Sequence, residues 1–209
     1  MATSFSGRSI AITASAALKF LSGGASGIGL AVARGLSLQG ASVYIADAAK
    51  ESPAELQNQR NVYYTGECDI TNRGACKRFI DSIPDRLDGL VNCAGICPAE
   101  GKQPSDDVFE RIMAVNTTGT WNIGTEAIRR MSQQEQRQQP GLIPGTERSL
   151  PAGSIVNIGS GASLRGIADM AAYCASKHAV LGLTRSWAKD WPSLRVNMVA
   201  PGKSIVIPA

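Results

Sequence analysis

The chain has 209 residues, enough for one domain with a substantial buried core. Its 21 Lys and Arg residues stand against 17 Asp and Glu residues, and the net charge of +4 is spread without a basic stripe. This pattern argues against a nucleic-acid partner. No apolar run reaches the roughly 20 residues that a membrane-spanning helix needs, so no membrane association is predicted.

Cysteine and histidine usage gives little support for a metal site. The five cysteines form an odd set without Cys-x-x-Cys pairs, so we expect reduced thiols and a cytoplasmic location. The single histidine, His178, has no cluster of Asp, Glu or Cys beside it in the sequence, and it is expected to lie on a helix surface or to pack against one. No metal is predicted.

Short β-rich runs alternate with longer helical patterns along the chain. The predicted strands are nearly continuous in Val, Ile and Ala, as expected when both faces of a sheet are buried; they are 9–13, 42–46, 62–65, 89–92, 154–158 and 195–199. The predicted helices are 28–39, 53–59, 73–83, 105–132 and 170–190. This alternation predicts an α/β fold with a parallel sheet covered by helices.

Residues 132–152 interrupt this pattern. They read SQQEQRQQPGLIPGTERSLPA, which is rich in Gln, Pro and Gly and poor in core-forming residues. We therefore expect a flexible surface loop there. Because the sequence contains no internal repeat and no second hydrophobic core, residues 1–209 are predicted to form a single domain.

A glycine-rich segment, SGGASGIG at residues 22–29, stands immediately before the first predicted helix. Gly23, Gly27 and Gly29 would let the backbone approach a pyrophosphate, whose charge the following helix N-terminus favours. Taken alone, such a segment is equally well read as a flexible turn.

Asp47 adds a second indication of a dinucleotide site. It closes a predicted strand about twenty residues after the glycine segment, where a carboxylate accepts hydrogen bonds from the adenosine ribose hydroxyls. The same charge repels a 2′-phosphate. Because neither Ser26 nor Ala48 is cationic, NAD(H) is favoured over NADP(H) as the cofactor, with NADP(H) as the alternative.

Tyr173 and Lys177 stand one helical turn apart, thirteen residues after Ser160 at the end of a predicted strand. Side chains at i and i+4 share a helix face, so the ammonium is expected to lower the pKa of the phenol from about 10 toward about 7. Such a group can transfer protons at neutral pH. The alternatives are a turn cap for Ser160 and a packed aromatic for Tyr173.

The motifs SGGASGIG, Asp47, CDIT, NCAG, MAVNTTG, Ser160, YCASK and RVNMVAPG occur in the order seen in the short-chain dehydrogenase/reductase family. The resemblance covers about residues 5–202. It implies a Rossmann-like, doubly wound parallel sheet with helices on both faces. The catalytic residues that it implies are Ser160, Tyr173, Lys177 and Asn116.

The resemblance also implies the role of each residue. Tyr173 is expected to act as general acid in carbonyl reduction and as general base in alcohol oxidation. Lys177 is expected to hold the nicotinamide ribose, Ser160 to bind the substrate oxygen, and Asn116 to support a water-linked proton path. The cofactor-binding residues implied are Gly23, Ser26, Gly27, Ile28, Gly29, Asp47, Asp69, Ile70, Asn92, Ala94, Gly95, Tyr173, Lys177, Pro201 and Gly202.

The sequence departs from the family pattern in two places. Residues 14–22, ASAALKFLS, are expected to be an insertion before the glycine segment. With 9–13 as the first strand they form an excursion, whereas a first strand at 18–22 would bury Lys19 in the sheet. After Gly202 the chain reads KSIVIPA, so we expect a sheet without the family's last strand and substrate-lid segment.

The sequence thus predicts an NAD(P)-dependent oxidoreductase that interconverts a secondary alcohol and a ketone, with a small-molecule substrate. Two alternatives remain: a dinucleotide-binding protein with a non-oxidative role as a cyclase, sensor or partner-binding subunit, and an inactive truncated form. The resemblance also implies a homodimer that pairs through the helices carrying Asn116 and Tyr173.

Overall fold

A computed structural model describes residues 5–14, 27–57, 59–84, 86–140 and 146–202. The main sheet in this part of the chain has six parallel strands in the order β3-β2-β1-β4-β7-β8. The strands are β1 Ser9–Ala14, β2 Ser42–Asp47, β3 Val62–Thr65, β4 Gly89–Asn92, β7 Gly153–Ile158 and β8 Leu194–Val199. The strand order reverses between β1 and β4, which is where doubly wound sheets bind ligands.

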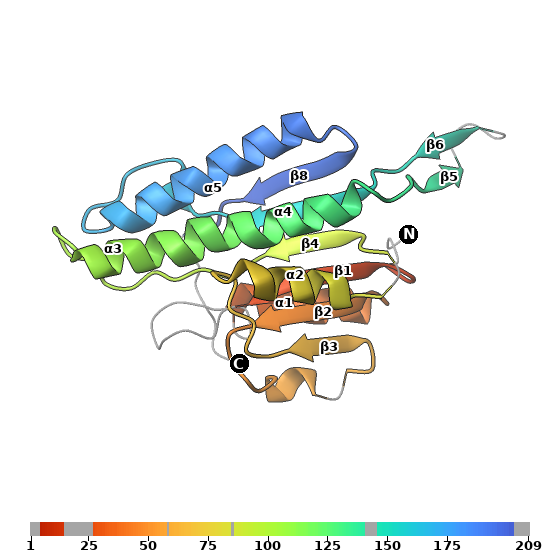
Figure 1. Cartoon of the computed structure of the whole chain (residues 1–209), viewed down its shortest axis with the longest axis horizontal. Coiled ribbons are helices and arrows are strands. Elements are labelled where there is room, and N and C mark those ends of the chain that lie inside the picture. The colour runs from red at the N-terminus through yellow and green to blue at the C-terminus, as the bar shows by residue number, and fades with distance from the viewer. Residues whose placement is uncertain (1–4, 15–26, 58, 85, 141–145, 203–209) are drawn as a thin grey trace.

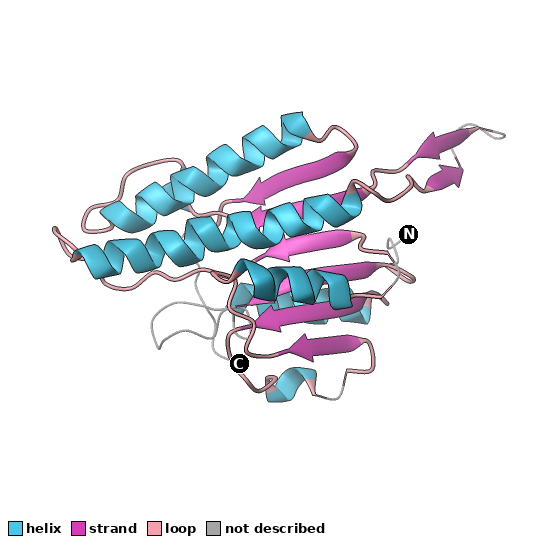
Figure 2. Cartoon of the chain, in the orientation of Figure 1, coloured by secondary structure: helices cyan, strands magenta, loops and turns pink. Residues whose placement is uncertain are grey.

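Helices cover the sheet on both faces (Figure 1). Helix α1, Gly27–Leu38, lies behind it, whereas α2 Arg73–Ser82, α4 Thr120–Met131 and α5 Ala171–Asp190 lie in front. Helix α3, Asp106–Met113, continues through a π-helical turn at Ala114–Gly119 into α4. Figure 2 shows the strands side by side in one layer with helices packed against it. The Rossmann-like fold class predicted from sequence is confirmed.

Two hydrophobic layers separate the sheet from its helices. Ala11 and Leu90 belong to the layer shared with α2, α4 and α5, which includes Phe79, Ile123 and Trp187. Ile10 and Ile12 point the other way, into a layer with Val43, Ile45 and Ala33 of α1. Successive residues of β1 are therefore buried on opposite faces, and this explains the continuous apolar runs of the strands.

The predicted elements agree closely with the structure. Each of the six predicted strands is present, with ends within one residue of the prediction. The predicted helix at 53–59 is only a short 3-10 turn, Ala54–Leu56. Leu56 is the one side chain that this turn buries, which is too little apolar contact to extend a helix.

The segment 132–152, predicted to be a flexible surface loop, contains a short antiparallel pair: β5 Gln138–Pro140 with β6 Glu147–Ser149. The Gln138 amide donates to the Ser149 hydroxyl at 3.0 Å, and Leu150 N donates to Arg137 O at 2.7 Å. The pair extends away from the end of α4 in Figure 1. Polar contacts between β5 and β6 hold this pair together. Such contacts leave no apolar periodicity in the sequence.

The first strand is Ser9–Ala14 and lies in the centre of the sheet, between β2 and β4. Of the expected insertion 14–22, only Ala14 is among the described residues. Gly23 and Ser26 of the glycine segment also lie outside them. None of the described helices is both long and apolar enough to cross a membrane.

Candidate active site

A line of buried polar side chains runs across the carboxyl ends of the central strands. Thr13 Oγ1 donates to Asn92 Oδ1 at 3.3 Å, and Asn92 Nδ2 donates to Asn157 Oδ1 at 2.9 Å. Asn157 Nδ2 in turn donates to Thr184 Oγ1 of α5 at 2.9 Å. Because buried polar groups must find partners, this line fixes β1, β4 and β7 against α5 in one register.

A cavity of about 350 Å³ opens at this edge of the sheet. Its lining includes three residues that the resemblance assigns to the cofactor site, Asp69, Ile70 and Ala94, together with Ala48, which was considered as a position for a cation. Asp47, directly before Ala48, is fully buried, and its Oδ1 accepts from Ala49 N at 2.8 Å. The Asp69 carboxylate accepts from the backbone N–H and the hydroxyl of Thr71, both at 2.9 Å, which holds it at the rim.

Helix α1 begins at Gly27, the first described residue of the glycine segment. Its φ of +61° is a left-handed conformation that glycine adopts without strain. Ile28 is half-buried and Gly29 is buried against the sheet. The N–H groups of a first helical turn are natural partners for an anion.

Ser160 follows β7 in a turn that lies against the segment after β8. Gly159 N donates to Val199 O and Gly161 N to Pro201 O, both at 2.8 Å. Ser160 Oγ accepts from Ala162 N at 3.2 Å, which makes it a cap, as the alternative interpretation of this residue predicts. Gly202 is exposed next to Pro201.

Tyr173 stands in the first turn of α5, and its phenol lies near the side chain of Ser160. Burial raises the pKa of Tyr173, and the neighbouring Ser160 side chain opposes this shift without cancelling it. The predicted lowering of this pKa by Lys177 is therefore wrong. The Lys177 ammonium lies 5.7 Å from the ring centroid, and loss of hydration dominates at the phenol.

Lys177 is 5% exposed, and its Nζ donates to Ile158 O at 2.9 Å. Burial lowers the pKa of Lys177 to about 8, against the opposing influence of Cys97 and Cys93. The ammonium thus lies between the end of β7 and the Tyr173 ring, and it titrates near neutral pH.

Asn116 is fully buried in the π-helical turn. Its Oδ1 accepts from Ile96 N at 2.7 Å, and its Nδ2 donates to Ile96 O at 2.9 Å and to Ser176 Oγ at 3.0 Å. A Cβ added at Gly95 would meet Asn116 Oδ1 at 3.2 Å and Lys177 Nζ at 3.4 Å. Gly95 therefore lies against both predicted catalytic side chains.

Two charged residues near these groups were missed by the analysis of the sequence. Arg111 lines the 350 Å³ cavity, although only Ser26 and Ala48 were considered as positions for a cation there. Arg111 stands four residues before Val115, which lines the same cavity. Residues at this spacing share a helix face, and this is the signal that could have revealed Arg111. Glu100 contacts the first turn of α5 from a loop 72 residues earlier in the chain, and no local sequence pattern predicts that contact.

The described residues contain no group of three or more His, Cys, Asp or Glu side chains that could hold a metal ion. A parallel sheet with a strand-order reversal and a cavity at the carboxyl ends of its strands define a dinucleotide-binding α/β protein of the Rossmann type.

Comparison with known proteins narrows this class. The family described as short chain dehydrogenase matches residues 19–204, and the chain belongs to this family. The chain is 37% identical over 201 residues to the short-chain dehydrogenase/reductase ABA4 of Pyricularia oryzae, covering 87% of this chain but only 66% of that protein. It is 36% identical over 192 residues to 2-(S)-hydroxypropyl-CoM dehydrogenase 3 of Xanthobacter autotrophicus, covering 87% of this chain and 69% of that protein.

Solved structures of similar fold include complexes with both nicotinamide dinucleotides. ElxO with NADP bound has a TM-score of 0.77 and 26% identity, with 93% of this chain and 73% of that chain covered. An NAD⁺-bound xylitol dehydrogenase has a TM-score of 0.76 and 28% identity, with 96% of this chain and 72% of that chain covered.

Proposed function

We propose that this chain is an NAD(P)-dependent oxidoreductase that interconverts a secondary alcohol and a ketone. The observation that carries the proposal is the convergence of Ser160, Tyr173 and Lys177 on one site, with Gly95 close to both Lys177 and Asn116. Relatives named as dehydrogenases support it.

The residues of the site fit a nicotinamide dinucleotide. A side chain at Gly95 would crowd Asn116 and Lys177, so glycine keeps the floor of the site open beside them. Asp47, Asp69 and Ile70 would hold the adenosine half, and the amino end of α1 the pyrophosphate. The nicotinamide half would be held by Asn92, Ala94, Gly95, Tyr173, Lys177, Pro201 and Gly202. When bound, the cofactor accepts or supplies a hydride.

Tyr173 exchanges the proton of the substrate hydroxyl. Its raised pKa keeps the phenol protonated at neutral pH, which suits a general acid in ketone reduction. In alcohol oxidation the phenolate takes the proton, so the rate of oxidation is expected to rise at alkaline pH. The Ser160 hydroxyl binds the substrate oxygen and stabilises its developing charge. Lys177 holds the nicotinamide ribose, and Asn116 supports the path by which protons reach the lysine.

NAD(H) is the favoured cofactor because Asp47 closes β2 as a buried carboxylate, next to the cavity. A 2′-phosphate there would meet a like charge. Arg111 on the cavity wall is a cation that could pair with a 2′-phosphate, so NADP(H) is the alternative cofactor. Binding of the two cofactors is therefore compared directly.

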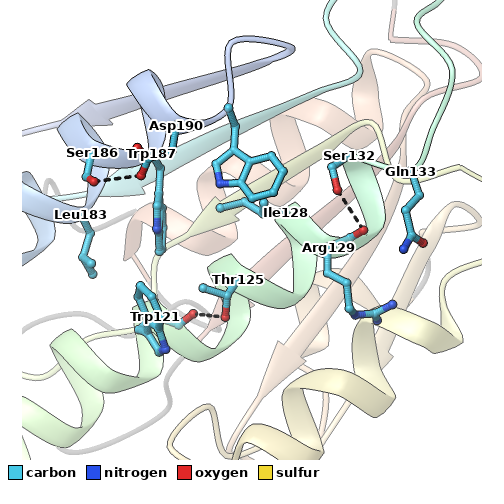
Figure 3. A pocket seen from close by; sticks show the side chains of 11 residues that line it. Trp121, Thr125, Ile128, Arg129, Ser132, Gln133, Leu183, Ser186, Trp187 and Asp190 are labelled. Atoms are coloured by element: carbon cyan, nitrogen blue, oxygen red, sulfur yellow. Dashed lines mark hydrogen bonds between the residues drawn. The ribbon is translucent and has the colours of Figure 1, made fainter.

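We also propose a homodimer that forms through α4 and α5, in a reducing compartment such as the cytoplasm. An apolar groove of about 500 Å³ runs between the outer sides of these helices (Figure 3). Trp121 and Trp187 line it with ring centroids 6.0 Å apart, and Trp121 is 45% exposed. All five cysteines are free thiols, which fits reducing conditions.

The test is turnover of a panel of secondary alcohols and ketones with NADH and NADPH in parallel, together with fluorescence titration of both cofactors. We expect NADH binding and turnover, and a loss of about 10³-fold or more in kcat for Tyr173→Phe, since the proton donor is removed while the ring is kept. NADH binding without turnover, unaltered in Tyr173→Phe, would favour the non-oxidative alternative. Absence of cofactor binding and of a cooperative melting transition would favour the inactive form.

A further inference from the structure

Helix α5 begins without a cap from its own segment. Its N-cap residue is Met170, which makes no side-chain cap hydrogen bond. The first N–H groups of any helix lack partners within the helix and must find acceptors elsewhere. Here the acceptors belong to Glu100, which lies 72 residues before Ala172 in the chain.

Glu100 binds two consecutive amides with its two carboxylate oxygens. Oε2 accepts from Ala172 N at 2.7 Å, and Oε1 accepts from Tyr173 N at 2.9 Å. Charge-assisted bonds of this length are the stronger kind, and an anion at the amino end of a helix is favoured by the helix dipole. One of the two amides belongs to Tyr173 itself, so the carboxylate acts directly on the backbone of that residue.

The loop that carries Glu100 is fixed at its other end by Asn116. Both backbone groups of Ile96 bond to the Asn116 amide, at 2.7 and 2.9 Å, four residues before Glu100. Asn116 also donates to Ser176 of α5 at 3.0 Å. Residues 96–100 therefore form a short bridge between the buried amide and the first turn of α5.

We propose that Glu100 is a positioning residue for Tyr173. Its carboxylate fixes the first turn of α5 and so sets where the phenol meets Ser160 and Lys177, without touching substrate or cofactor. This inference rests on the proposed role of Tyr173 in proton transfer. Because a misplacement of about 1 Å in a catalytic group can cost about 100-fold in rate, loss of this clamp should lower kcat by about 10-fold or more.

The experiment compares Glu100→Ala and Glu100→Gln with Glu110→Gln, a control at an exposed position on α3. Amide hydrogen exchange at Ala172 and Tyr173 is read first, and then kcat and KM. We expect Glu100→Ala to exchange at least 10-fold faster at both amides and to lose kcat while substrate KM changes less than threefold. Glu100→Gln keeps one carbonyl acceptor and should fall between Glu100→Ala and the wild type, whereas the control should match the wild type.

A merely structural role is tested against a variant expected to lower stability elsewhere. Asp88→Asn removes a carboxylate that pairs with Arg8, Arg86 and Arg137, and both variants are assayed well below their melting temperatures. If Glu100→Ala loses no more kcat than Asp88→Asn, the positioning role is overturned. Unchanged exchange at Ala172 and Tyr173 in Glu100→Ala would overturn the clamp itself. A wild-type protein without turnover, whose Glu100→Ala variant still exchanges faster at these amides, would reject the proposed function and leave the clamp standing.

Discussion

Burial of the Lys177 ammonium lowers the stability of the folded protein at neutral pH. Its pKa is about 8 in the folded protein and about 10.5 in an unfolded chain. Between these values the unfolded chain binds a proton that the folded chain releases, so this residue makes stability rise with pH in that window. Below pH 8 the full penalty of the buried charge is present.

This reasoning predicts a difference between wild type and Lys177→Met. From pH 8 to pH 10 the unfolding free energy of the wild type should gain about 2 kcal/mol relative to Lys177→Met, because only the wild type carries the titrating amine. Urea unfolding at a series of pH values measures it. Lys189→Met, at an exposed position of α5, serves as the control and should run parallel to the wild type. Parallel curves for Lys177→Met as well would contradict the buried charge.

At the scale of single residues, the sequence predicted which side chains lie together but not the direction in which the pKa of Tyr173 shifts. The four-residue spacing predicted that Tyr173 and Lys177 share one face of α5, and their ring-to-ammonium contact agrees with it. The direction of the Tyr173 pKa was wrong because burial of the phenol depends on the surrounding fold, which spacing does not reveal. Glu100 was missed for a related reason, since its contact with α5 joins segments far apart in the chain.

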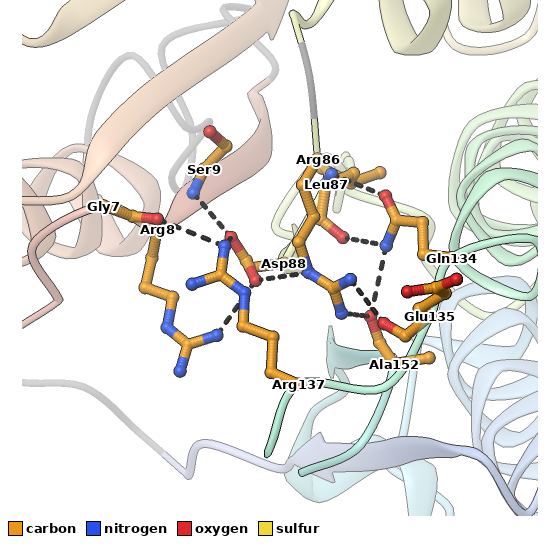
Figure 4. Close-up of polar contacts among 10 residues, drawn as sticks. All are labelled: Gly7, Arg8, Ser9, Arg86, Leu87, Asp88, Gln134, Glu135, Arg137 and Ala152. Carbon is orange, nitrogen blue, oxygen red and sulfur yellow. Dashed lines mark hydrogen bonds and ion pairs between the residues drawn. The ribbon is translucent and has the colours of Figure 1, made fainter. Parts of the chain in front are cut away.

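A charged cluster ties several elements together at the amino edge of the sheet (Figure 4). Asp88, directly before β4, has a side chain only 7% exposed. It pairs with Arg8 before β1 at 3.0 Å, with Arg86 at 3.0 Å and with Arg137 before β5 at 3.3 Å. Arg86 also donates to the carbonyl oxygens of Glu135 and Ala152, both at 2.6 Å. This one carboxylate therefore anchors the first strand, the fourth strand and the β5–β6 pair.

Removing this charge should destabilise the protein. Asp88→Asn leaves three guanidinium groups facing a neutral amide, and we expect a loss of about 2 kcal/mol, or about 5 °C in Tm. Asp81→Asn is the matched control, because Asp81 also pairs with two cations but is 40% exposed. Water screens that pair, so its loss should cost less than about 1 kcal/mol. Equal shifts in thermal melts of the two variants would contradict the anchoring role of Asp88.

At the scale of elements, apolar burial decided which predictions succeeded. The strands β1 and β2 are rich in Val, Ile and Ala and bury side chains on both faces, and such runs are visible in the sequence. The β5–β6 pair buries no such run and is held by polar contacts such as that between Gln138 and Ser149. Its polar composition therefore suggested a loop.

For the whole molecule, the groove of Figure 3 gives the clearest prediction. Trp121→Glu should convert the proposed dimer to a monomer, because it places a charge in an apolar contact. Light scattering after size-exclusion chromatography measures the mass. Leu38→Glu is the control: Leu38 is 79% exposed at the end of α1, on the opposite face of the sheet. A wild-type monomer, or a Trp121→Glu dimer, would contradict the proposed interface.

The wide turn at Ala114–Gly119 sets the angular relation between the site and this groove. Asn116 points inward from the turn, and Trp121 faces outward shortly after it. Each residue of an α-helix advances the chain by about 100°, and a π-helical turn accommodates one residue more than an α-helical turn. If the same residues were wound as an α-helix throughout, α4 would thus be rotated by about 100° with respect to α3. The one extra residue in this turn therefore lets Asn116 face the candidate site while Trp121 faces the groove proposed as the dimer interface.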